Sequence, residues 1–185
     1  MNEFSPEAVL AREKDLLDVQ LRQLQKDLMP TIEVADIASA DERLETVRKQ
    51  IELLQQERQQ LIDLATAIIV NKDNPAEIKR LFKNVSEYFD KKSAESAKKL
   101  QTLWERNKKE ESSNSTAVQD YAKLKKIKED ALAINAAEVA VIANKAMAKT
   151  GYGMRLGEAE KESADLQRYQ DIALEFKRRS AGESV

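Results

Sequence analysis

Apolar residues recur at helical spacing through much of the chain. Between residues 40 and 71 they follow one another at intervals of three and four for more than three heptads. This spacing is typical of a helix that packs against another helix along one stripe. We call the stripe the interaction seam, and its members are Leu44, Val47, Ile51, Leu54, Arg58 and Leu61.

Arg58 interrupts the interaction seam at a position where an apolar residue is expected. Its aliphatic stem can pack against a neighbouring helix while the guanidinium reaches water. A polar residue at such a position can instead fix the register or the choice of partner helix. The sequence leaves both interpretations open.

Residues that cap or break helices mark the ends of several elements. Ser5 and Asn74 each precede a proline, which is typical of an N-cap followed by the first helical residue. Pro75 is also compatible with a kink inside one longer helix. Residues 105–115 are charged and then rich in Ser and Asn, which predicts a mobile loop. The predicted helices cover residues 6–29, 40–71, 75–110, 116–149 and 155–179.

The most apolar part of the chain is residues 131–148, where fourteen of eighteen positions are apolar and only Glu138 and Lys145 are charged. A helix that is apolar on several faces is normally buried among others, so we interpret this segment as a central core helix. The alternative is contact with a membrane, because a span needs about 20 apolar residues. Polar residues such as Asn135 count against permanent insertion but leave conditional insertion open. Either interpretation rests on Leu132, Ile134, Val139, Val141, Ile142 and Met147.

Four lysines directly precede this apolar segment: Lys123, Lys125, Lys126 and Lys128. A solvated helix face explains them without any further function. Because they adjoin an apolar segment, they could also contact anionic lipid headgroups.

Composition favours long helices over sheets. Charged residues make up 35% of the chain and aromatic residues 5%, with four glycines and three prolines. Runs of aromatic and β-branched residues, which favour strands, are scarce. We therefore predict an all-α fold in a single elongated domain over residues 1–185, an antiparallel helical bundle or coiled coil of about five helices.

The residue types that carry most catalysis near neutral pH are missing. The chain has no cysteine and no histidine, which excludes disulfides and thiolate chemistry and removes the commonest general base and metal ligand. It also lacks a glycine-rich phosphate loop. We interpret Glu158, Glu160 and Glu162 as a solvated face. We expect no enzymatic activity, no metal, no cofactor and no small-molecule substrate.

Charge and the N-terminal residues bear on partners and location. The net charge of −2 gives no concentrated basic face of the kind that nucleic acid requires, so we do not expect nucleic-acid binding. The first residues are acidic and polar, with no apolar run behind basic residues, so we see no secretory signal. We expect a cytoplasmic protein, while export without a signal peptide remains open.

Two functional hypotheses follow from these patterns. The first is a non-enzymatic helical interaction or assembly protein, a scaffold or subunit that binds a protein partner or another copy through coiled-coil surfaces. The second is a membrane-active helical protein, pore-forming or membrane-remodelling, that exposes residues 131–148 conditionally. The long helices and this apolar segment are similar in outline to helical pore-forming toxins and BAR-like membrane scaffolds, with no shared motif.

Overall fold

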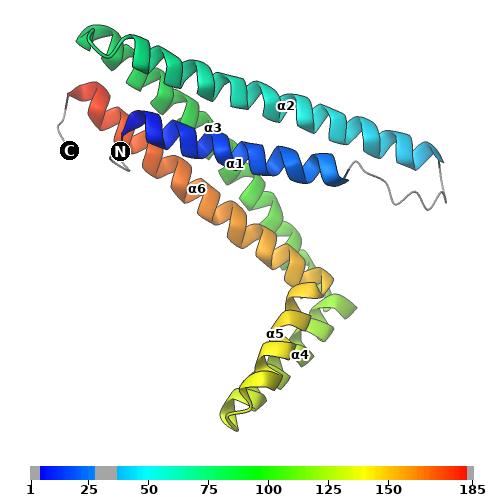
Figure 1. Ribbon diagram of the computed structural model, residues 1–185. Coiled ribbons are helices and arrows are strands. Elements are labelled where there is room, and N and C mark those ends of the chain that lie inside the picture. The colour runs from blue at the N-terminus through cyan, green and yellow to red at the C-terminus, as the bar shows by residue number, and fades with distance from the viewer. Residues whose placement is uncertain (1–4, 28–36, 183–185) are drawn as a thin grey trace. The chain divides into compact units, whose positions relative to one another are not determined.

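The computed structural model describes residues 5–27 and 37–182. These residues are 93% helical and contain no strand, which confirms the all-α prediction (Figure 1). The described part of the chain has six helices rather than five. They are α1 (Pro6–Asp27), α2 (Ile37–Val70), α3 (Pro75–Ser113), α4 (Thr116–Ala133), α5 (Ala137–Lys149) and α6 (Gly151–Ala181).

The chain divides into two compact units. Unit 1 contains Met1–Val85 and Phe176–Val185, and unit 2 contains Ser86–Glu175. Both boundaries fall inside the continuous helices α3 and α6 rather than in a linker, where domain boundaries usually lie. The single domain therefore stays a prediction.

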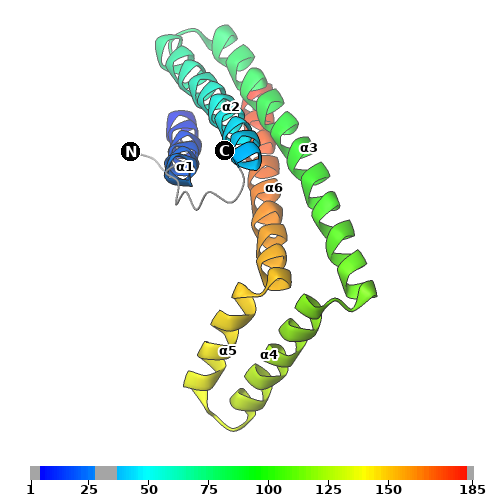
Figure 2. The same ribbon diagram turned by 90° about the vertical axis from the view of Figure 1, so that its right-hand side faces the viewer.

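In unit 1, α1 and α2 pack closely side by side and run antiparallel (Figures 1 and 2). Leu10 of α1 and Leu61 and Ile68 of α2 are almost completely buried. The first turns of α3 and the last turns of α6 add Phe82 and Phe176, whose rings meet edge to face with centroids 5.6 Å apart. Large side chains therefore fill the core of this unit.

Local hydrogen bonds fix the helix starts in unit 1. The Ser5 hydroxyl accepts a hydrogen bond from the Ala8 amide at 3.1 Å, and the Asn74 side chain accepts one from the Glu77 amide at 3.3 Å. Both predicted N-caps are thus confirmed. α2 ends at Val70, so Pro75 follows a turn rather than a kink. α2 begins at Ile37, three residues before the predicted start at residue 40.

The loop predicted over residues 105–115 is wrong for most of its length, because α3 continues to Ser113. The charged residues there are good helix formers, and Glu110 and Glu111 bond to side chains of α6. α3 ends where Asn114 takes a left-handed conformation with φ of 46°. The amides of Asn114 and Ser115 then bond back to the last turn, which is the Schellman arrangement.

In unit 2, α3 and α6 run antiparallel and pack through a small apolar cluster of Leu100, Leu103 and Ala159, with Leu166 against it. Nearby, the Ser96 hydroxyl and the Lys99 ammonium each lie 2.5 Å from the Glu162 carboxylate. Burial opposes ionisation of Glu162, but these two contacts outweigh it and hold its pKa below the usual value. The solvated-face interpretation is therefore wrong for Glu162, although Glu158 and Glu160 are exposed.

Candidate interaction surface on the α4–α5 hairpin

The helix predicted over residues 116–149 is interrupted by a turn at residues 134–136, which makes α4 and α5 an antiparallel hairpin (Figure 2). Asn135 has a φ of 56°, a left-handed conformation that Asn tolerates better than most residues. The Ala136 amide donates to the Ala131 carbonyl at 2.8 Å and the Asn135 amide to the Leu132 carbonyl at 3.1 Å. This is a second Schellman arrangement with Asn in place of Gly.

Mostly small side chains fill the contact between α4 and α5. Ala131 of α4 and Ala140, Ala143 and Met147 of α5 are buried. Alanine allows two helices to approach closely, and the spacing of three and four along α5 keeps one stripe facing α4. At one edge of the hairpin, the Lys128 ammonium donates to the Asn144 side chain at 2.9 Å.

The large apolar side chains of the hairpin lie outside this contact. Among the six residues on which the core or membrane interpretation rests, only Met147 is buried. The core-helix interpretation is therefore wrong for the other five, because alanines occupy the interior that these side chains would have needed. We call these five the apolar tip, with exposed fractions of 54% for Leu132, 76% for Ile134, 47% for Val139, 53% for Val141 and 67% for Ile142.

Basic residues flank the apolar tip on both helices, and all of those named next are exposed. Within the described residues, Lys126, Lys145 and Lys149 form no ion pair, while Lys125 makes only a long contact of 4.0 Å with Glu129. Within residues 131–143 the single charged side chain is Glu138. We call the flanking set the lysine collar, and it comprises Lys125, Lys126, Lys145 and Lys149.

A polar cluster joins the base of the hairpin to α3. The Tyr152 hydroxyl bonds to the Glu111 carboxylate, and the Arg155 guanidinium bonds to Glu110. Burial, together with the bond to Glu111, raises the pKa of the Tyr152 hydroxyl to about 12. The ring of Tyr121 from α4 meets the Tyr152 ring edge to face with centroids 5.3 Å apart. These contacts tie the beginnings of α4 and α6 to the end of α3.

An open pocket of about 680 Å³ lies between α3 and α6 in unit 2. Asn107 lines it, is only 6% exposed, and has no hydrogen-bond partner for either side-chain polar atom. The buried Nε of Arg155 also lacks a partner. The chain's one tryptophan, Trp104, lies at this pocket and is 59% exposed. The other lining residues are Lys108, Glu111, Leu156, Ala159, Glu160 and Ser163.

The predicted interaction seam lies in unit 1, on α2. Leu61 is buried and the other five members are half-buried. Since α1 packs along α2 and its Asp18 lies 2.5 Å from Arg58, this chain itself covers part of the seam. The interaction seam thus belongs to unit 1, whereas the apolar tip belongs to unit 2.

Arg58 forms a charged network with α1. Its guanidinium donates to Asp18, and the Lys14 ammonium lies 3.3 Å from the same carboxylate. The bond from Arg58, with a smaller effect of Lys14, holds the pKa of Asp18 below its ordinary value. The guanidinium of Arg58 therefore has a charged partner on α1 and does not reach water alone.

Sequence reasoning missed that the apolar tip is exposed. The available signal was Asn135, the residue besides Gly that most readily ends a helix in the left-handed conformation. The spacing of alanines in the second half of the segment was another, because it marks a close helix contact that excludes larger residues.

The remaining findings concern metal ions, membrane spans and similarity to known proteins. Within residues 5–27 and 37–182, no group of three or more His, Cys, Asp or Glu side chains could hold a metal ion. None of the helices that the structure describes is both long and apolar enough to cross a membrane. No protein-family model, curated protein sequence or solved structure matches the chain.

Proposed function

We propose that the protein is a non-enzymatic helical interaction protein, a scaffold or assembly subunit, and that the α4–α5 hairpin is the surface it presents to its binding partner. One observation carries this proposal. Five large apolar side chains lie exposed within residues 132–142, while small ones fill the hairpin interior. Scattered exposed apolar residues need no explanation, but a concentrated group marks an interaction site.

The sequence supports a binding role over catalysis. Without histidine or cysteine, proton transfer and covalent catalysis near neutral pH would depend on carboxylates, Lys, Tyr or Ser. Glu162 and Tyr152 form bonds that stabilise helix contacts rather than a catalytic arrangement. Glu162 links α6 to α3, and Tyr152 bonds to Glu111.

Light scattering coupled to size exclusion, in buffer and again with lipid vesicles, tests the proposal. The wild-type chain is compared with a tip variant that carries Leu132→Ser, Ile134→Ser and Ile142→Ser. The matched control carries Val19→Ser and Leu53→Ser, two substitutions at positions 60% and 58% exposed in unit 1. We expect association that the tip variant loses and the control keeps. A wild-type chain that is monomeric in both conditions contradicts the proposal.

A second candidate is assembly through the interaction seam, with the helices in an elongated antiparallel bundle or coiled coil. It is favoured by a difference in length, because α2 has 34 residues and α1 has 22. Leu44 and Val47 are only half-buried near the beginning of α2. Replacing Val47 with Asp should abolish association if this seam is the contact. Unchanged association in that variant rules the seam out.

A further inference from the structure

We propose that the partner of the apolar tip is an anionic lipid surface, into which the tip inserts to a shallow depth while the lysine collar contacts the headgroups. This inference rests on the proposed function, because it names the partner of the same surface. It is carried by the distribution of apolar side chains around the hairpin, the position of the lysines and the hydrogen bonds of the turn.

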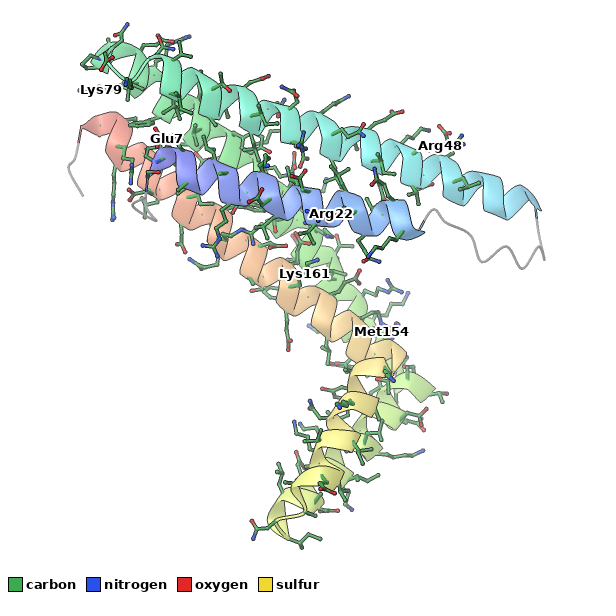
Figure 3. The ribbon with its side chains drawn as sticks, in the orientation of Figure 1. Glu7, Arg22, Arg48, Lys79, Met154 and Lys161 are labelled. Carbon is green, nitrogen blue, oxygen red and sulfur yellow. The ribbon has the colours of Figure 1, made fainter. Side chains whose placement is uncertain are left out.

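The apolar side chains surround the tip. Val139 and Ile142 are three residues apart and share one side of α5, whereas Val141 lies two residues after Val139 and points to nearly the opposite side. All three are exposed. Side chains also extend outward along both sides of the hairpin in Figure 3. A flat protein surface could cover one side of such a tip, whereas lipid covers every side of an inserted one.

The lysine collar lies at the height that shallow insertion requires. A helix rises about 1.5 Å per residue, so Lys149 stands roughly 10 Å from Ile142, and Lys125 a similar distance from Leu132. Interfacial helices bury their apolar faces about 5–10 Å into the boundary between headgroups and acyl chains. Inserting the tip to that depth brings the lysines to the anionic phosphates.

The turn pairs two of its own backbone amides, which lowers the cost of placing it in lipid. Polar backbone groups within lipid need partners inside the protein. The amides of Asn135 and Ala136 bond to the carbonyls of Leu132 and Ala131. The outermost part of the hairpin therefore buries fewer unpaired groups than an open loop would.

Flotation of the full-length chain with vesicles tests the inference. The vesicles are phosphatidylcholine alone, or phosphatidylcholine with phosphatidylserine, at low and high salt. We expect binding to the anionic vesicles that weakens with salt. The tip variant should bind at least tenfold more weakly, and each Lys→Gln change in the collar should cost about fivefold. The Val19→Ser, Leu53→Ser control should bind like wild type.

Insertion depth has its own readout because the chain has one tryptophan. In a Trp104→Phe background, Ile134→Trp should give fluorescence that shifts to the blue and is quenched by brominated lipid. Trp104 in the wild-type chain should remain unquenched. Equal helicity by circular dichroism confirms that each variant has folded.

The outcomes separate this inference from the proposed function. If neither vesicle type binds, or if the tip variant binds as well as wild type, the lipid inference is overturned. If the chain ignores vesicles but forms an oligomer that the tip variant loses, the partner is a second copy, and the proposed function stands without the lipid inference.

Discussion

The α1–α2 pair and the α4–α5 hairpin are both antiparallel helix pairs, but they bury side chains of different size. Each pair is antiparallel and closely packed. Between α1 and α2 the large residues Leu10, Leu61 and Ile68 lie inside, whereas between α4 and α5 mostly alanines lie inside and the branched residues lie outside. Among the described residues of unit 1, the exposed large apolar side chains are Val19, Leu53 and the adjacent pair Ile69 and Val70, whereas the hairpin concentrates five of them within residues 132–142. The number of apolar residues in a helix pair therefore does not indicate which of them are buried. The size of the side chains at the contact between the two helices decides which face lies inside.

The largest expected effect comes from removing a large buried side chain from the core of unit 1. Leu61→Ala should lower the free energy of unfolding by about 2–5 kcal/mol, because Leu61 is almost fully buried and its removal leaves a cavity. Urea titration followed by circular dichroism measures the change. In the hairpin, Ile142→Ala should alter stability by less than about 0.5 kcal/mol, since the side chain is exposed. Equal decreases in the free energy of unfolding for the two variants would contradict the proposed difference between the α1–α2 pair and the α4–α5 hairpin.

Placing a larger side chain in the contact between α4 and α5 should produce the next largest effect. Ala143→Leu places three extra carbons where α4 and α5 approach closely, and overpacking of this kind typically costs about 1–3 kcal/mol. Hydrogen exchange of the α4 and α5 amides reports the local loss. The matched control is Ala148→Leu, an exposed position of the same helix. If the α4 and α5 amides of both variants are as protected from exchange as those of wild type, the contact between α4 and α5 is not tightly packed.

The turn that separates α4 from α5 should be sensitive to residue type. Asn135→Val should destabilise the hairpin by about 1–2 kcal/mol, because a β-branched residue is strained in the left-handed conformation. Asn135→Gly should be neutral or slightly stabilising, since Gly adopts that conformation freely. Thermal unfolding of both variants compares them. A valine variant as stable as the glycine variant would indicate that α4 and α5 form one continuous helix in solution.

The smallest effect concerns the charged network on α1 and α2. Because the pKa of Asp18 is lowered in the fold, its ionised form stabilises the protein at pH well above 3.8, and this contribution is lost as the pH falls through the lowered value. Wild type should therefore exceed Asp18→Asn in stability at neutral pH, with a difference that fades in acid. Denaturant titrations from pH 7 to pH 3 measure it.

The control for this pH dependence is Glu129→Gln in the hairpin. Its partner Lys125 is 4.0 Å away and both side chains are exposed, so solvent screens the pair and the stability difference should be small at every pH. A difference between wild type and Asp18→Asn that does not change with pH would show that the Asp18 charge adds nothing to the α1–α2 contact.

Local features could be predicted from the sequence, and features that depend on distant contacts could not. Ser5 and Asn74 bond to amides three residues away, so their capping role follows from adjacent residues alone. Residues 105–113 look like a loop by composition, yet contacts with α6 through Glu110 and Glu111 hold them in a helix. The Arg58 partner could not be named either, because Asp18 is forty positions away.

The sequence by itself determined that the chain is helical, where two of the helices begin, and which side chains share a face, because propensity, caps and periodicity act over a few residues. The tertiary structure decided which of those faces are buried. In residues 131–148 the periodic pattern offered both an alanine stripe and a set of larger apolar residues. Close packing of α4 on α5 buried the alanines and Met147 and left Leu132, Ile134 and Ile142 exposed, because mostly small side chains fit between two helices in such close contact.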